Sequence, residues 1–358
     1  MGKRVRVIIV DDSQVMRDML AQIVRSNPDM EVVATAQDPF DAREKIKVLS
    51  LDVILFDIEM SRMDGLTFLE RIMRLRPMPV VMVSTLTVAG GTATLRALEL
   101  GAVDFVTKPS VLKSAESVNI FAADIAAKVR IAAASVPSIA RRAPAALIEK
   151  PAIAPLGVAA HHAVVAIGAS TGGIEAITTV ICALPGDMPP ILIVQHLPQP
   201  FTRLFAGRLN TLSRLKVKEA EVGDILHPGH VYIAPGNLHL RLGRGLSGYV
   251  ALLSDDPLLN GHRPAVDHLF ASVAQHAGKE AVGVILSGMG ADGAAGLLRM
   301  RQAGALTVGQ DAATCVVYGM PRAAYELNAV IKQAPLEKVA DEILVCLRSL
   351  EKVSIAKR

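Results

Sequence analysis

The sequence predicts an α/β protein of two domains, each built on a doubly wound, mainly parallel sheet. Three observations support this fold class. The length of 358 residues suits two domains. Short apolar runs alternate with segments of helical spacing in both halves. Polar residues follow many of these runs directly, where open parallel sheets build their sites. We expect domains at 1–130 and 163–354, joined by a linker at 131–162.

Composition excludes several classes of protein. With 51% hydrophobic and 20% charged residues the chain is globular, and no apolar run reaches membrane-spanning length. The net charge of +4, without basic clusters among aromatics, argues against a nucleic-acid partner. The N-terminus shows no secretory signal, and three scattered cysteines predict buried thiols in a reducing compartment. We therefore expect a cytoplasmic protein without membrane insertion.

The first half predicts a flavodoxin-like (βα)5 domain. Its helices include 14–24, one that starts at the Asp38-Pro39 pair, and a last one over about 115–133. Five apolar runs between such segments predict a parallel sheet covered on both faces. The expected strands are 5–10, 31–36, 51–56, 79–83 and 103–106.

Five polar side chains follow these strands at their carboxyl ends: Asp11, Asp12, Asp57, Ser84 and Lys108. In a doubly wound sheet these ends share one edge. Three carboxylates brought together repel one another, so they predict a hard divalent cation such as Mg²⁺. A carboxylate beside that ion, a lysine and a hydroxyl can accept a phosphoryl group. The alternative for any single acid is a loop carboxylate or a helix cap.

These residues resemble the receiver domain of bacterial response regulators over about the first 125 residues. The resemblance implies that Asp57 accepts the phosphoryl group from a histidine kinase and that Asp11 and Asp12 help it hold Mg²⁺. It also implies that Ser84 is the switch hydroxyl and that Lys108 contacts the phosphoryl group. The family's loop after the acceptor matches residues 60–65, and the Lys108–Pro109 bond becomes a candidate cis peptide.

The segment 131–162 predicts a semi-extended linker. Of its 32 residues, 11 are Ala and 4 are Pro, which is too few large apolar groups for a core. Its first residues are expected to continue the last helix of the preceding domain.

The second half is organised around the strand–turn–helix corner at 163–173, which carries Ser170 between glycines. Three interpretations compete for this corner. Ser170 or Thr171 caps the helix, the glycine-rich turn binds a nucleotide as in short-chain dehydrogenases, or Ser170 is a nucleophile in a G-x-S-x-G pattern. The turn alone does not choose among them.

The rest of this half predicts further strands and helices. Helices are expected at 200–212, 264–275, after 293, after 320 and at 336–350, and buried strands at 191–194, 281–286 and 305–308. Four shorter strands joined by glycine turns predict an antiparallel excursion from the main sheet. They lie at 217–219, 230–234, 238–242 and 249–253.

Three polar residues then decide between the interpretations of the corner. Ser170, His196 and Asp292 each follow a different buried strand, and these are the types that an activated serine requires. The Gly288-Met289-Gly290 turn offers backbone N–H groups for an oxyanion. Taken singly, His196 could be a loop residue and Asp292 a cap for the helix after Gly293.

The competing folds fit less well. No tyrosine has a lysine four residues later, as the dehydrogenase interpretation requires, and no acid follows the second strand. An ordinary α/β-hydrolase orders its triad as serine, acid, histidine, whereas this chain has serine, histidine, acid.

This half resembles the catalytic domain of the chemotaxis protein-glutamate methylesterase family. The matching segments, in chain order, are 168–173, 195–198, 232–236, 288–293 and 318–321. The resemblance implies Ser170 as nucleophile, His196 as base, Asp292 as the group that orients it and the Met289 amide as an oxyanion donor. Thr171 is implied as an assisting residue, and no cofactor is implied for the esterase reaction.

The two resemblances together imply a response regulator whose output is a serine esterase. It would hydrolyse glutamate methyl esters on chemoreceptor helices and deamidate receptor glutamines, with the unphosphorylated receiver inhibiting the catalytic domain. Two alternatives stay open: a non-enzymatic receiver-regulated adaptor, and a methylesterase that serves another receptor pathway.

Overall fold

The computed structural model describes residues 3–60, 65–85, 87–108, 115–135 and 162–355. The chain divides into two compact units, Met1–Pro144 and Ala145–Arg358. Most of the predicted linker, the loop at 61–64 and Pro109 lie outside the described residues. The expected cis peptide at 108–109 and the linker's conformation therefore stay predictions, as do the domain boundaries.

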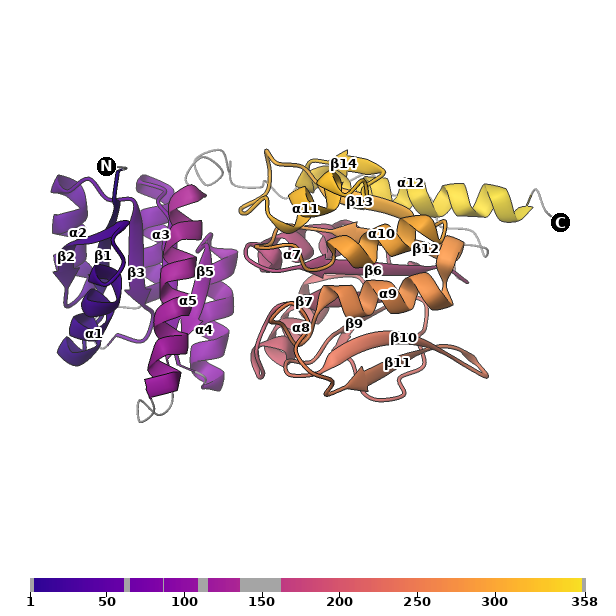
Figure 1. Cartoon of the computed structure of the whole chain (residues 1–358), viewed down its shortest axis with the longest axis horizontal. Helices are drawn as coiled ribbons and strands as arrows, with labels where there is room; N and C mark the ends of the chain where they lie inside the picture. The colour runs from indigo at the N-terminus through magenta and orange to yellow at the C-terminus, as the bar shows by residue number, and fades with distance from the viewer. Residues whose placement is uncertain (1–2, 61–64, 86, 109–114, 136–161, 356–358) are drawn as a thin grey trace. The chain divides into compact units, whose positions relative to one another are not determined.

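The first unit is a five-stranded parallel sheet with the order β2-β1-β3-β4-β5 (Figure 1). Helix α1 packs with α5 and α3 packs with α4, so helices cover both faces of the sheet. The strands are β1 (Val5–Val10), β2 (Met30–Ala36), β3 (Val53–Asp57), β4 (Val80–Ser84) and β5 (Asp104–Thr107). The helices are α1 (Gln14–Arg25), α2 (Pro39–Val48), α3 (Gly65–Leu75), α4 (Val88–Glu99) and α5 (Ala115–Ala134).

Strand order explains where this unit places its polar residues. The chain leaves β1 toward β2 on one side and returns to β3 on the other, so β1 and β3 border the topological switch point. Strands β3 and β4 are buried along their whole length, as covered faces require. Asp11 follows β1 and Asp57 ends β3, so both carboxylates lie at that point.

The second unit is a seven-stranded sheet with the order β14-β13-β12-β6-β7-β9-β8, every pair of neighbours being parallel. Its strands are β6 (Val164–Ala169), β7 (Ile191–Gln195), β8 (Lys216–Glu219), β9 (His230–Ile233), β12 (Ala281–Ile285), β13 (Leu306–Gln310) and β14 (Lys332–Ala334). Its helices are α7 (Gly173–Ala183), α8 (Phe201–Leu212), α9 (Val266–His276), α10 (Ala294–Gln302), α11 (Met320–Glu326) and α12 (Leu336–Ile355), with a short 3₁₀ helix at Gly278–Glu280.

Helix layers cover this sheet too. Helix α9 packs with α10, and α7 packs with both α8 and α12 (Figure 1). The central strands β6, β7 and β12 are buried at every position, which agrees with their continuous apolar sequences. Strand β6 lies between β12 and β7, so the second switch point is at the end of β6.

The structure confirms an antiparallel excursion but limits it to two strands. Strands β10 (His239–Gly245) and β11 (Gly248–Ser254) pair antiparallel in a sheet of their own. The expectation was wrong for β8 and β9, which extend the main sheet in the parallel direction. Strand β14 was missed because it is three residues long and begins with exposed Lys332.

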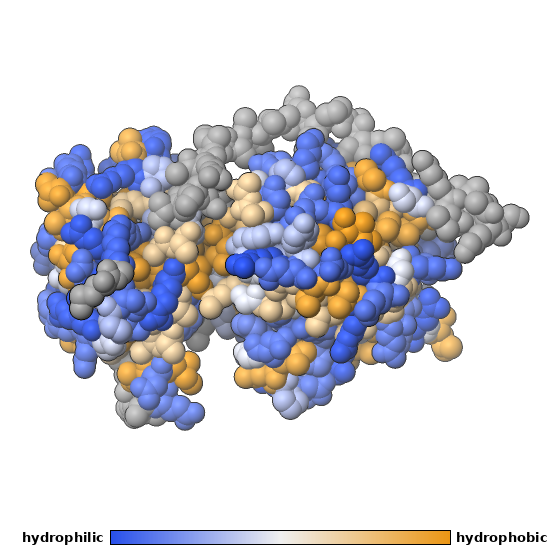
Figure 2. All heavy atoms as spheres, turned by 45° about the horizontal axis from the view of Figure 1, so that its top comes forward, coloured by the Kyte–Doolittle hydropathy of each residue, from blue (hydrophilic) through white to orange (hydrophobic). Residues whose placement is uncertain are grey.

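Composition also predicts a globular chain, no membrane-spanning segment and buried cysteines. Polar and apolar residues are interspersed on the face of the molecule that Figure 2 shows. Among the described residues, no helix is both long and apolar enough to cross a bilayer. None of the three cysteines, all of which lie among the described residues, forms a disulfide, and only Cys315 is buried; Cys182 is exposed, so its expected burial was wrong. It lies on the outward side of α7, at a position that the helical pattern leaves away from the core.

Candidate functional sites

The serine corner lies at the centre of the second sheet, with Ser170 immediately after β6. Its backbone N–H donates to Ser287 O at 3.0 Å, and its carbonyl oxygen accepts from Gln195 Nε2 at 2.8 Å. Ser170 is therefore held from both neighbouring strand ends by its main chain. The structure shows no hydrogen bond from its hydroxyl to a described residue.

The turn after Ser170 requires glycine. Gly172 has a φ of +75°, and a Cβ there would lie 2.5 Å from Val316 Cβ. Gly172 is also the N-cap residue of α7 and has no side chain with which to cap it. The interpretation of Ser170 or Thr171 as the N-cap of this helix is therefore wrong.

His196 and Asp292 meet across the end of β6. His196 follows β7 on one side and Asp292 follows β12 on the other, and His196 Nε2 lies 2.8 Å from Asp292 Oδ2. The side chains are 7% and 2% exposed, so water competes little for this bond. The backbone N–H of His196 donates to Ala169 O at 3.2 Å, which fixes it next to the serine corner.

The second ring nitrogen of His196 is a buried atom without a partner. Nδ1 has no hydrogen bond within the part of the chain that the structure describes. Because a buried, unpaired nitrogen is costly, it indicates a site that needs a donor. With Nε2 protonated toward the carboxylate, Nδ1 carries the lone pair of a base.

The ionisation of Asp292 matches this arrangement. Burial alone would raise its pKa, but the hydrogen bond and charge of His196 and two backbone bonds lower the pKa to about 2. These bonds come from the N–H groups of Val266 at 2.7 Å and Asp267 at 3.1 Å. Asp292 thus caps α9, whereas the sequence suggested the helix after Gly293.

Asp292→Asn should destabilise the protein most at neutral pH. The pKa of Asp292 falls from an ordinary 3.8 to about 2 on folding. The ionised carboxylate therefore contributes about 2 kcal/mol above pH 4, and this is lost as the pH falls through 2. Urea unfolding at pH 7 and pH 3 measures the difference between variant and wild type. A gap that stays constant or widens at pH 3 would contradict this account.

The glycine loop after β12 lies against Ser170. A Cβ on Gly288 would clash with Met320 Sδ and lie 3.0 Å from Ser170 Cβ, so glycine lets the loop pack closely against this corner. The Gly288 N–H donates to Val317 O at 3.1 Å, whereas that of Met289 makes no hydrogen bond to a described residue. Met289 therefore has an N–H available one residue from the contact with Ser170. Thr171 is buried, and its carbonyl oxygen accepts from Ser287 Oγ at 2.8 Å.

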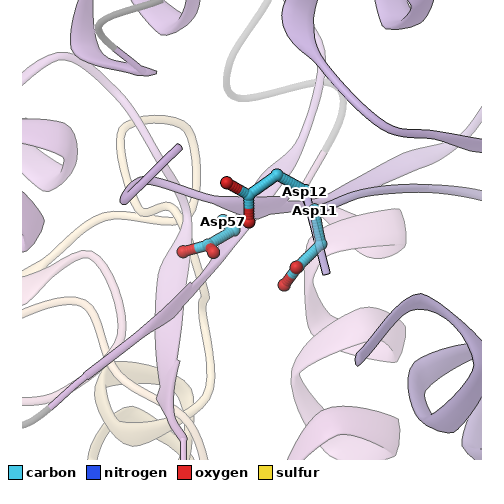
Figure 3. Close-up of side chains that lie close together, drawn as sticks. All are labelled: Asp11, Asp12 and Asp57. Carbon is cyan, nitrogen blue, oxygen red and sulfur yellow. The ribbon is translucent and has the colours of Figure 1, made fainter. Parts of the chain in front are cut away.

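The acidic edge of the first sheet brings together Asp11, Asp12 and Asp57 (Figure 3). Their ligand oxygens all lie within 4.8 Å of one another. Asp11 and Asp57 are buried and Asp12 is exposed. A set of three carboxylates, open on one side, fits a hard cation such as Mg²⁺ that keeps some of its waters.

Lys108 joins the same cluster from the end of β5. Its Nζ donates to Asp57 Oδ2 at 2.7 Å and to Asp11 Oδ2 at 3.2 Å. Burial raises the pKa of Asp57 to about 6, despite the opposing effect of Lys108 and with a further increase from Asp11. An added cation would relieve the part of this increase that comes from the neighbouring Asp11 carboxylate.

Ser84 is buried at the end of β4, beside β3. The preceding residue, Val83, pairs in register with Asp57, so Ser84 lies one residue beyond Asp57 along the strands. Thr94 Oγ1, on α4, donates to Ser84 Oγ at 2.6 Å. The hydroxyl is thus linked to α4.

Sequence reasoning missed two residues near the His196–Asp292 pair. Asn260 Nδ2 donates to Asp292 Oδ1 at 3.2 Å, and the ring of His262 stacks on that of His196. Both lie in an irregular segment with no periodicity. The Asn260-Gly261 pair, typical of a tight turn, was the signal that could have drawn attention to it.

Fold and sites together define a response regulator whose second unit is a parallel α/β domain with serine, histidine and aspartate at one edge of its sheet. Residues 7–117 match the family model described as the response regulator receiver domain, and residues 165–343 match that of the CheB methylesterase. The chain belongs to the CheB methylesterase family.

The similarity to curated relatives extends over nearly the whole chain. A protein-glutamate methylesterase/protein-glutamine glutaminase 1 of Burkholderia pseudomallei (strain 1710b) is 53% identical, covering 98% of each chain. One from Salmonella typhi is 51% identical, covering 98% of this chain and 99% of its own. The crystal structure of the Thermotoga maritima CheB methylesterase catalytic domain is 38% identical with a TM-score of 0.49, covering 50% of this chain and 96% of its own.

Proposed function

We propose that the second unit is a serine esterase that hydrolyses glutamate methyl esters on chemoreceptor helices and deamidates receptor glutamines. The buried, unpaired Nδ1 of His196 carries this proposal. It lies on a ring fixed by Asp292, at the end of the strand next to the one that bears Ser170. A serine hydroxyl is the donor that such a nitrogen lacks.

In the proposed reaction Ser170 Oγ attacks the ester carbonyl while His196 Nδ1 takes its proton. The Met289 N–H stabilises the oxyanion, with Thr171 assisting, and Asp292 stabilises the charged imidazole. His196 then returns the proton to the leaving methoxide, which departs as methanol. Water, deprotonated by His196, attacks the acyl-enzyme carbonyl, and His196 gives that proton to Ser170 Oγ as the bond between Oγ and the acyl carbon breaks.

The first unit is proposed to regulate this activity. Asp57 would accept a phosphoryl group from a histidine kinase in the cytoplasm, with Asp11, Asp12 and Asp57 holding Mg²⁺. The bound ion would neutralise charge on the phosphoryl oxygens. Lys108 would contact the same oxygens and Ser84 would link the change to α4. The unphosphorylated receiver would inhibit the catalytic domain until Asp57 is modified.

Methanol release from methylated receptor membranes tests the activity directly. The full-length protein is expected to release methanol, and to release it faster when a small phosphodonor and Mg²⁺ are present. A fluorophosphonate probe should label Ser170 stoichiometrically. If neither methanol release nor labelling is observed, the esterase proposal is wrong and the adaptor alternative remains.

A further inference from the structure

His262 lies face to face with His196. The two ring centroids are 3.8 Å apart and the ring planes differ by 16°, so the rings are stacked. His262 is half-buried. Its ring therefore covers one face of the imidazole that we propose as the base.

The position of His262 is fixed by a tight turn. Leu259 and His262 exchange both backbone hydrogen bonds, at 2.9 and 3.1 Å. The two residues between them, Asn260 and Gly261, have φ of +55° and +80°. These are the φ values of a type I′ turn, for which Asn-Gly is the preferred sequence.

The same turn also contacts the carboxylate partner of His196. Asn260 Nδ2 donates to Asp292 Oδ1 at 3.2 Å and to Asp267 Oδ2 at 2.9 Å. One turn of four residues therefore touches both members of the His196–Asp292 pair. Neither contact is needed to close the turn, because its backbone bonds already do so.

A single hydrogen bond does not fix an imidazole plane. The ring torsion of histidine has a broad minimum, so His196 could pivot about its bond to Asp292. A pivot would move Nδ1 relative to the serine corner. Small misplacements of a catalytic group are costly, since about 1 Å can lower a rate by about 10²-fold.

We propose that His262 is a positioning residue, whose stacked ring holds His196 in the plane that presents Nδ1 to Ser170. This rests on the proposed serine mechanism. A stacked neutral ring also favours the positive charge that His196 gains during attack. Burial lowers the pKa of His262, and the charge of His196 lowers it further. Because the opposing charge of Asp292 is a smaller effect, the pKa falls to about 4 and the ring is neutral at pH 7.

Three substitutions in the full-length protein separate this role from a structural one, with a chromogenic acetyl ester as substrate. His262→Phe keeps a neutral stacked ring and should stay within about 3-fold of wild-type kcat. His262→Ala removes the stack and should lower kcat by about 10–30-fold with little change in KM. His262→Arg keeps a stacking plane but adds a charge beside the forming imidazolium, and should lower kcat at least as much as alanine.

The control is His227→Ala, which removes an exposed histidine whose ring centroid lies 5.8 Å from that of His230, with the ring planes tilted by 60°. Unfolding temperatures show which variants fold; if alanine does not, the Phe and Arg variants carry the comparison. Wild-type kcat in the alanine variant, or equal losses with Phe and Arg, would overturn the proposal. The Ser170→Ala variant is measured in the same assay. If it keeps its turnover, the serine mechanism and this inference are both wrong. If turnover depends on Ser170 but not on residue 262, only this inference is wrong.

Discussion

Ser170→Ala is expected to lower kcat for methyl ester hydrolysis by about 10³-fold or more while the protein stays folded. The nucleophile is lost, but the main-chain bonds that hold this corner are kept, since they use the N–H and carbonyl of residue 170. The change removes one hydroxyl that makes no recorded hydrogen bond to the described residues. We therefore expect the free energy of unfolding to change by less than about 1 kcal/mol.

The measurement is methanol release from methylated receptor membranes, together with urea unfolding of the same preparations. Ser349→Ala is a matched control, because it removes a serine hydroxyl that donates to Val345 O on the exposed side of α12. The control should retain wild-type turnover. Turnover that persists in the Ser170 variant would show that another group attacks the ester.

Much of both sites could be predicted because parallel sheets gather their functional residues at one edge. Asp57 ends a buried apolar strand, Ser170 and His196 each directly follow one, and that pattern is local. The receiver cluster shows the strength of this argument, since residues at the ends of β1, β3 and β5 meet there and Lys108 does contact Asp57 and Asp11.

The sequence did not determine the direction in which short strands pair or the contacts that irregular segments make. A strand of four residues such as Lys216–Glu219 carries too little sequence pattern to predict its pairing direction, and it pairs parallel with β9. The turn at Asn260 and Gly261 reaches His196 from more than sixty residues away in sequence. No periodicity reports such a contact, because it is made by the tertiary fold of a loop.

Asp292 shows how a structural role and a chemical role coincide. The sequence offered helix cap and catalytic orienter as alternatives, and the carboxylate accepts bonds from the first turn of α9 and from His196 together. The N-terminus of a helix favours negative charge. The same bonds that anchor α9 therefore keep Asp292 ionised, which an orienting carboxylate requires.

Asp57→Asn is expected to abolish phosphoryl labelling by a small phosphodonor, lowering it by at least about 10²-fold. The amide has nearly the shape of the carboxylate but lacks its nucleophilic oxygen charge. Lys108 keeps Asp11 as a partner at 3.2 Å, so the edge of the sheet should still form. Basal esterase activity should persist in the variant, while its activation by the phosphodonor should be lost.

Labelling is measured with radioactive phosphodonor in the presence of Mg²⁺, and chelation of the ion should prevent it in the wild type. Asp18→Asn is the matched control, since it makes the same chemical change at an exposed carboxylate that contacts only Gln14 among the described partners. Labelling should be unchanged there. Persistent labelling of the Asp57 variant would show that another residue accepts the phosphoryl group. Asp11 and Asp12 are the other carboxylates of the cluster, so Asp→Asn substitutions at these two positions would identify that residue.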